Sequence, residues 1–147
     1  MTIASVIATL VAGLFSGACV YVTMVEHPAR IECGPALAIK EFGRSYRRAT
    51  LMQAPLAVLG LVTGVVAWAQ GSGDRWLMGA LLLGAMVPFT LIVIGPTNRR
   101  LTDASLDSSS SEAVALLTRW GRLHAVRTVV GVGVFVIFAC GTLTPSR

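Results

Sequence analysis

The sequence predicts an all-α integral membrane protein in which four helices form a bundle. The 147-residue chain has a mean hydropathy of +0.74, with 54% hydrophobic and 13% charged residues, more apolar surface than a soluble domain of this size could bury. Four runs contain neither a charged residue nor a histidine, at 3–25, 49–69, 76–94 and 128–143. The basic residues gather between these runs, as they do in membrane proteins of defined topology.

The first run, residues 3–25, is long enough to cross a bilayer, which takes about 20 apolar residues. No positive charge precedes it, and it is longer than the apolar core of a signal peptide, so we expect a retained helix. GxxxG patterns, which let helices approach closely, occur in the first two runs, at Gly13–Gly17 and Gly60–Gly64. These faces could serve packing within one chain or a homo-oligomer.

Residues 36–48 place large apolar side chains among charges, as an interfacial helix does. This segment leads directly into the second run at 49–69, so we expect the second membrane helix to extend beyond the bilayer. The third run, residues 76–94, follows after a short connection and has the length of a membrane span.

A polar linker, residues 102–110, separates the third run from the last helix. The pattern Ser109-x-x-Glu112 predicts a capping box at the start of that helix. We expect the helix to begin near Ser110, to enter the membrane at about 124 and to end near Leu143. At 1.5 Å per residue it is roughly 50 Å long, more than the ~30 Å hydrocarbon core. The whole chain, 1–147, is expected to form one domain.

Positive charge lies almost entirely on one side of this arrangement. Ten of the twelve Lys and Arg residues fall in the two long connections or at the start of the last helix, and only Arg75 and Arg147 lie on the other side. The positive-inside rule then makes both long connections cytoplasmic and both termini external. We expect a multi-pass plasma-membrane protein surrounded by lipid. The net charge of +5 reflects this topology and not binding to nucleic acid.

The two halves of the chain resemble each other weakly. GRSYRRAT at 43–50 aligns with GRLHAVRT at 121–128 at glycine, arginine and threonine. Each half contains an apolar helix, an exit with a proline, and a long helix that returns to the membrane. We therefore predict a parallel two-helix repeat within a four-helix bundle whose second and fourth helices extend on the cytoplasmic side.

Polar side chains collect where the helices reach the cytoplasmic boundary. They are Glu26 and His27 after the first run, Asn98 after the third, and Trp120, His124 and Arg127 at the entrance to the last helix. Polar groups at this depth are costly unless they pair or serve a site. Arg127 lies deepest, and the nearest carboxylate on this topology is Glu26, which we expect to be its partner.

The sequence also resembles a known family. GPTNRRL at 95–101, RWGRLHAVRT at 119–128 and VEHPAR at 25–30 are similar to motifs of the anthrone oxygenase-like family of small four-helix membrane proteins. That family includes fungal oxygenases that convert polyketide anthrones to anthraquinones without an evident cofactor, and many members with no assigned function. The resemblance spans nearly the whole chain. It directs attention to Pro28, Asn98, Trp120, His124 and Arg127.

The resemblance implies an oxygenase that takes a lipophilic aromatic substrate and O2, with no cofactor and no metal. His124 would be the base that removes an acidic C–H proton, and Arg127 would stabilise the resulting enolate or superoxide. Asn98 would hold the carbonyl oxygen, and Trp120 would stack on the flat aromatic substrate. Trp120 is therefore a substrate-binding candidate, and we add Glu26 and His27 because of their position at the same membrane boundary.

Two other functions remain open on the sequence alone. Glu26, His27 and His124 could ligate iron or copper in a metal-dependent oxidase, although adjacent residues on one helix diverge by about 100°. A non-catalytic module that binds a partner protein or lipid would also place polar residues here. A proton-coupled transporter is disfavoured because no acidic residue lies inside the four runs. A cavity lined by His124, Arg127 and Asn98 would favour the oxygenase, whereas close packing of these side chains would favour the module.

Overall fold

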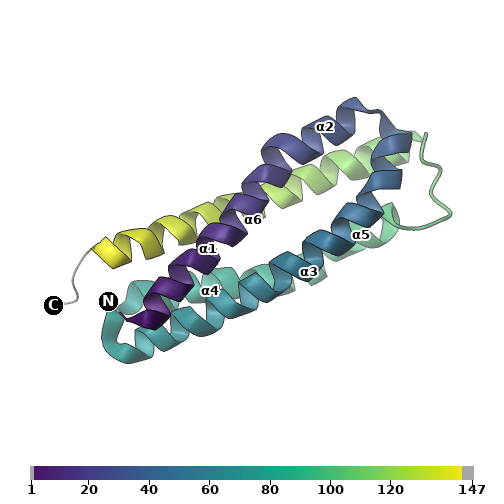
Figure 1. The fold of residues 1–147 in the computed structure, drawn as a ribbon. Helices are drawn as coiled ribbons and strands as arrows, with labels where there is room; N and C mark the ends of the chain where they lie inside the picture. Colours follow the sequence, from purple (N-terminus) through teal and green to yellow (C-terminus); the bar gives the residue numbers. More distant parts are fainter. Residues whose placement is uncertain (1, 144–147) are drawn as a thin grey trace.

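The computed structural model describes residues 2–143, and within that range the chain is helical with no strand. Four long helical segments lie side by side in a bundle (Figure 1). They are Ile3–Glu32, Pro35–Ser72, Asp74–Leu101 and Ser111–Leu143, and each is long and apolar enough to cross a membrane. The predicted fold class is confirmed: the chain is an all-α, multi-pass membrane protein.

The first half contains a break in regular helix at the end of the first span. Its elements are α1 (Ile3–Tyr21), the π-helical turn η1 (Val22–Glu26), α2 (His27–Glu32), and α3 (Pro35–Ala67), which ends in the π-helical turn η2 (Trp68–Ser72). Pro28 has no N–H to donate to the carbonyl four residues earlier, so the helix rearranges its hydrogen bonds before it. The N–H of His27 accordingly bonds the carbonyl of Val22, five residues back. Gly34, at φ +84°, then turns the chain into α3.

The second half repeats this order of elements. It consists of α4 (Asp74–Phe89), the π-helical turn η3 (Thr90–Ile94), α5 (Gly95–Leu101) and α6 (Ser111–Leu143). In each half an apolar helix passes through a π-helical turn into a short helix with proline in its first turn, Pro28 or Pro96. A connection then leads to a helix of 33 residues. The elements therefore follow the predicted parallel repeat.

The start of α6 differs from the predicted capping box by one residue. The Oγ of Ser110, and not of Ser109, accepts a hydrogen bond from the backbone N–H of Ala113 at 3.2 Å. The carboxylate of Glu112 bonds Arg100 instead, from which it accepts two hydrogen bonds, at 2.7 and 2.9 Å. This ion pair ties the start of α6 to the end of α5 across the linker. The prediction of Ser109 as the cap is therefore wrong.

A second carboxylate, that of Asp103, stabilises the start of the linker. Asp103 accepts a hydrogen bond from the backbone N–H of Ser105 at 2.9 Å and pairs with Arg100 at 3.2 Å. The bond from Ser105 is the main reason why the pKa of Asp103 lies below its usual value. Asp103 is consequently charged at neutral pH and can hold Arg100 in place.

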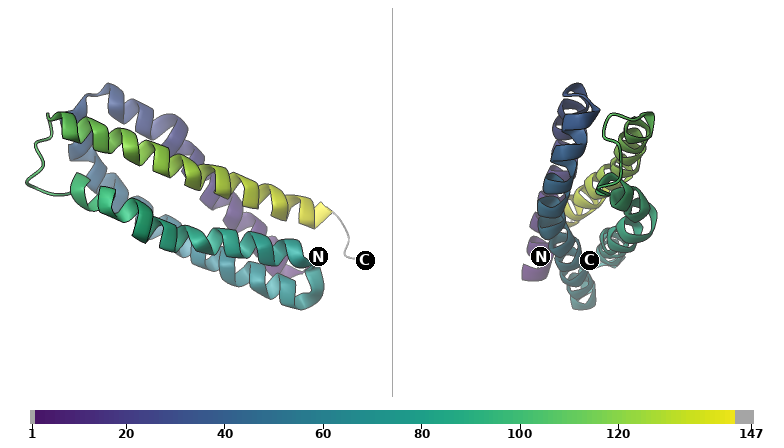
Figure 2. Two further views of the ribbon diagram at one scale, coloured as in Figure 1. Left: turned by 180° about the vertical axis from the view of Figure 1, so that it is seen from behind. Right: turned by 90° about the vertical axis from the view of Figure 1, so that its right-hand side faces the viewer.

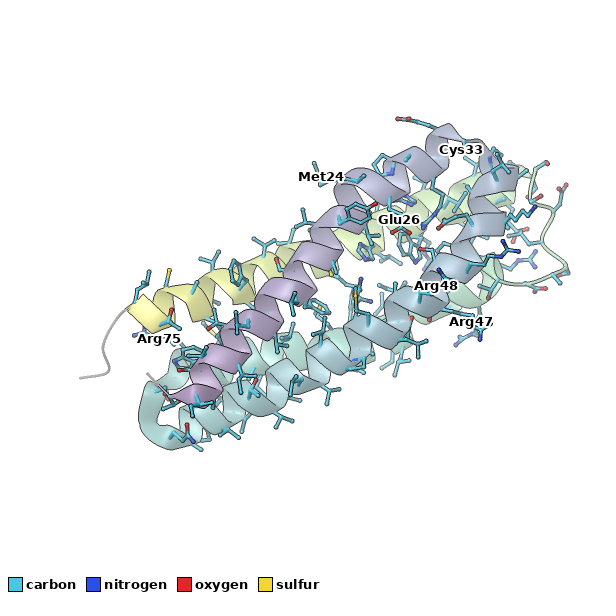
Figure 3. All side chains as sticks on the ribbon, viewed as in Figure 1. Met24, Glu26, Cys33, Arg47, Arg48 and Arg75 are labelled. Atoms are coloured by element: carbon cyan, nitrogen blue, oxygen red, sulfur yellow. The ribbon has the colours of Figure 1, made fainter. Side chains whose placement is uncertain are left out.

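The two ends of the bundle differ in charge. The N-terminus and the end of α6 lie at one end, and the linker lies at the other (Figure 2). Arg47 and Arg48 lie toward the linker end, whereas Arg75 lies at the end with the termini (Figure 3). Arg147 lies outside the described residues. The separation of charge by ends thus follows the sequence prediction.

The glycines of the second GxxxG pattern form a helix–helix contact within the chain. Both are buried: Gly60 lies against the side chain of Leu83, and a Cβ on Gly64 would come 2.8 Å from that of Ala80. Helix α3 therefore packs on α4 through this face, which leaves no room for a second copy there. Gly17 of the first pattern is exposed, and a Cβ added to it would meet nothing within 4 Å, so a homo-oligomer through that side stays a prediction.

Gly79 marks one of the tightest helix contacts and gives a stability test. A Cβ there would collide with the ring of Phe138, which is fully buried and stacked on Trp76 with 4.7 Å between ring centroids. We expect Gly79→Ala to destabilise the protein by about 1–3 kcal/mol through overpacking. Gly17→Ala, in open space, should be neutral or slightly stabilising because alanine favours helix. Denaturation of the purified variants measures both, and equal stability would contradict this packing.

Candidate active site

A cavity lies between two apolar clusters of the bundle. One cluster contains Phe15, Trp76, Leu83 and Phe138, and the other contains Phe42, Ile94, Leu101 and Leu117. The cavity has a volume of about 90 Å³, enough for several water molecules, and its wall includes residues of η1, α3, η3, α5 and α6. Five of the six predicted site residues line it: Glu26, Asn98, Trp120, His124 and Arg127. His27 is not part of its wall.

His124 is held on two sides. Its side chain is buried, and its Nδ1 lies 3.1 Å from the Oγ1 of Thr23 in η1. Its ring stacks on that of Trp120, with 4.8 Å between centroids and 24° between planes. The two residues are four apart on α6, so the helix places them on one face, one above the other. The imidazole is therefore fixed in orientation where it borders the cavity.

Trp120 links α6 to α5 through Asn98. The indole Nε1–H donates to the Oδ1 of Asn98 at 2.8 Å, and both side chains are buried. The amide Nδ2 of Asn98 has no hydrogen-bond partner among the described residues. Asn98 borders the cavity, and this nitrogen is itself buried with almost no accessible surface.

Arg127 does not pair with Glu26, and that prediction is wrong. Its Nη2 donates to the Oε1 of Gln53 at 2.7 Å, and its Nη1 donates to the Oγ1 of Thr90 at 2.9 Å. Its Nε is buried without a partner, and no ion pair to Arg127 occurs within residues 2–143. Arg127 is thus a half-buried cation whose hydrogen-bond partners are neutral.

Glu26 instead forms an ion pair with Arg30, four residues further along the chain. Arg30 forms ion pairs with Glu26 and Glu41, and its side chain is buried over the ring of Phe42 at 5.5 Å. Figure 3 shows Glu26 between the first span and α3. On the sequence alone, Arg30 counts only as a loop charge. The i, i+4 spacing of Glu26 and Arg30 is the signal that could have revealed this pair.

Gln53 and Thr90 are two further cavity residues that the sequence did not predict. Each is a neutral polar residue inside one of the uncharged runs, and each lines the cavity. A single amide within a membrane span is uncommon unless it has a partner, so Gln53 carries a usable signal. Threonine can bond its own helix carbonyl, as Thr90 does to Met86 at 2.7 Å, and its presence in a span is less informative.

His27 lies behind Trp120 and outside the cavity wall. The centroids of the two rings are 5.2 Å apart, and a Cβ on Gly121 would come 2.5 Å from the Nε2 of His27. His27 therefore packs where only glycine leaves space on α6. Within the described part of the chain, no three His, Cys, Asp or Glu side chains are grouped as metal ligands, so Glu26, His27 and His124 do not form such a set.

A family match covers most of the cavity wall. The sequence profile of a family described as anthrone oxygenase matches residues 42–137. The chain belongs to the anthrone oxygenase family. It is 28% identical over 132 residues to a relative named anthrone oxygenase tpcL from Aspergillus fumigatus, a match that covers 83% of this chain and 82% of the relative. No solved structure is similar enough to count as a match.

The anthrone oxygenase match and the cavity coincide in part. The matched range contains Gln53, Thr90, Asn98, Trp120, His124 and Arg127, and it excludes Glu26, His27 and Arg30. The wall contributed by α3, η3, α5 and α6 therefore lies within the segment shared with the family.

Proposed function

We propose that this protein is a membrane oxygenase that oxidises a lipophilic, anthrone-like aromatic substrate with O2 in the cavity beside His124. The observation that carries the proposal is the cavity itself. His124, Arg127 and Asn98, which are up to 29 residues apart in the sequence, border one space instead of packing against one another. Membership of the anthrone oxygenase family supports the class of reaction.

Three residues of the cavity wall each carry a nitrogen donor without a partner in the described part of the chain, which suits a substrate that brings oxygen atoms. Asn98 Nδ2, Arg127 Nε and Arg30 Nη1 are buried nitrogen donors with no partner in residues 2–143. An unpaired buried donor costs about 1–3 kcal/mol, which an acceptor on a ligand recovers. The carbonyl oxygen of an anthrone and the oxygens of phenol groups on its rings are acceptors of this kind.

The first chemical step is removal of a proton by His124. The CH2 group of an anthrone is flanked by two aromatic rings conjugated with a ketone, so its C–H bond is acidic. Transfer of this proton to the imidazole leaves an enolate whose charge rests largely on oxygen. Arg127, which has no carboxylate partner in residues 2–143, is placed to stabilise that charge, and the unpaired Nδ2 of Asn98 can donate to the same oxygen.

Reaction with O2 then follows from the electron-rich enolate. The enolate gives one electron to O2, and the resulting superoxide and carbon radical combine to form a C–O bond. The peroxide takes back the proton from the imidazolium. Loss of the second C–H proton with cleavage of the O–O bond gives a ketone and water. In sum, one CH2 group and one O2 become one C=O group and one H2O.

We place the linker end of the bundle, which carries most of the basic residues, on the cytoplasmic side of the plasma membrane, with both termini outside. The cavity then lies toward the cytoplasmic boundary. An open groove beside Tyr21, Val25 and Leu37 shares Glu26 and Arg30 with the cavity wall. Its exposed apolar side chains suit entry of a flat substrate from the lipid.

The test is oxygen consumption by the purified protein in lipid nanodiscs with a hydroxylated anthrone. Anthrones oxidise slowly without help, so protein-free nanodiscs supply the baseline. The proposal predicts a rate above this baseline that saturates with substrate and a quinone as product. A rate equal to the baseline across a series of anthrones would contradict it and would favour a non-catalytic membrane module.

A further inference from the structure

A chain of hydrogen bonds connects His124 to a backbone carbonyl of α1. The Nδ1 of His124 contacts the Oγ1 of Thr23 at 3.1 Å, and this oxygen contacts the Oγ1 of Thr128 at 2.7 Å. Thr128 in turn contacts the carbonyl oxygen of Cys19 at 3.2 Å. We infer that Thr23 and Thr128 hold His124 as the tautomer with the proton on Nδ1, which leaves Nε2 free to act as a base.

The direction of each hydrogen bond follows from the carbonyl at the end of the chain. A carbonyl oxygen only accepts, so the 3.2 Å contact is a hydrogen bond only if Thr128 donates its single hydroxyl proton to Cys19. The longer contact of Thr128 with the carbonyl of His124, at 3.4 Å, needs the same hydroxyl proton. With that proton used, Thr23 donates to Thr128, and its own proton is used in turn. The remaining contact then requires Nδ1–H of His124 to donate to Thr23.

The opposite arrangement of donors and acceptors makes fewer hydrogen bonds. If Thr128 donated to Thr23 and Thr23 donated to Nδ1, the contacts of Thr128 with both carbonyl oxygens would lack a proton. The tautomer of a histidine is set by the bond that one ring nitrogen makes. Here that bond requires the ring proton to be on Nδ1, which leaves a lone pair on Nε2. No hydrogen bond reaches Nε2 from residues 2–143, and Nε2 is absent from the buried polar atoms that lack partners.

The two π-helical turns play matching parts in this arrangement. Thr23 belongs to η1 and contacts His124, whereas Thr90 belongs to η3 and accepts from Arg127. Each half of the repeat thus supplies a threonine from its π-helical turn to one of the two chemically important residues of α6. Such turns are found often at functional sites. Thr23 and Thr128 are accordingly positioning residues, which act through His124 and do not line the cavity themselves.

The tautomer can be tested without turnover, by ¹⁵N NMR of protein labelled at histidine. Protonated and unprotonated ring nitrogens resonate at well-separated frequencies, and their couplings to the ring C–H protons distinguish Nδ1 from Nε2. The chain has two histidines, and His124→Gln identifies the signals of residue 124 by their loss. At a pH well above the usual imidazole pKa of about 6.5, we expect protonated Nδ1 and unprotonated Nε2. A proton on Nε2 in the wild type would overturn the inference.

Variants of Thr23 separate the hydrogen bond from the shape of the side chain. Thr23→Val keeps the shape and removes the acceptor, so the Nδ1–H signal should give way to a mixture of tautomers, whereas Thr23→Ser should keep it. Thr63→Val is the matched control, because the hydroxyl of Thr63 bonds the carbonyl of Leu59 on its own helix. An unchanged Nδ1–H signal in Thr23→Val would overturn the inference.

The kinetic consequence rests on the proposed oxygenase function, whereas the tautomer itself does not. We expect Thr23→Val to lower kcat for oxygen uptake about ten-fold with little change in KM, and Thr23→Ser to restore most of it. If the NMR result holds but no form of the protein consumes oxygen, the function fails and the tautomer stands. If oxygen uptake is catalysed but Thr23→Val matches the wild type, the positioning role fails.

Discussion

Replacement of His124 by glutamine should lower kcat for anthrone-dependent oxygen uptake by about 10²- to 10⁴-fold, the usual contribution of a positioned general base. Glutamine keeps a polar side chain of moderate size in contact with Thr23 and Trp120, but it cannot accept a proton near neutral pH. The same variant should lose exchange of the substrate CH2 protons with solvent deuterium in the absence of O2. This anaerobic exchange isolates the proton transfer from the later oxidation.

His27→Gln is the matched control for this prediction. His27 contacts Trp120 but does not line the cavity, so the variant should keep most of the activity. Far-UV circular dichroism and thermal denaturation check that both variants fold. A comparable loss in the two variants, with both folded, would contradict the assignment of the base to His124.

Replacement of Arg127 by methionine should reduce kcat by about 10²- to 10³-fold, as loss of one oxyanion-stabilising donor does. Methionine is an unbranched side chain that lacks the guanidinium group, which lies over the ring of Phe15 at 5.5 Å and contacts Gln53 and Thr90. The loss should fall mainly on kcat, because the enolate charge develops only during the reaction. Steady-state oxygen uptake over a range of anthrone concentrations separates kcat from KM.

The control for Arg127 lies on the same helix. Arg122 is exposed, and Arg122→Met removes the same charge without touching the cavity, so its kinetics should match the wild type. If Arg127→Met raises KM alone, Arg127 binds the substrate equally in the ground and transition states, and its proposed role would be wrong.

The fold could be predicted from the sequence because hydropathy alone locates membrane spans. The positions of Trp120, His124 and Arg127 on one face also follow from helical periodicity, which fixes the relation of side chains within one helix. These three residues could therefore be predicted together, and Asn98 could be predicted from its place at the end of the third run; the structure places all four around one cavity.

Contacts between helices could not be predicted in the same way. They depend on how far each helix is rotated about its axis, and the π-helical turns change that rotation at Thr23 and Thr90. This is why the predicted partner of Arg127 is wrong and why Arg30 had no predicted role in the cavity. Gln53 is a polar amide inside an uncharged run, and this could have indicated that it is a partner of Arg127.

The central claim is that O2 delivers an oxygen atom to the substrate in the cavity beside His124. The most direct test is the rate at which nanodisc-bound protein forms ¹⁸O-labelled quinone from an anthrone under ¹⁸O₂, with wild type and His124→Gln prepared in parallel. We predict labelled quinone from the wild type well above the protein-free rate, and from His124→Gln at close to that rate. Equal rates from the wild type and His124→Gln would contradict the claim.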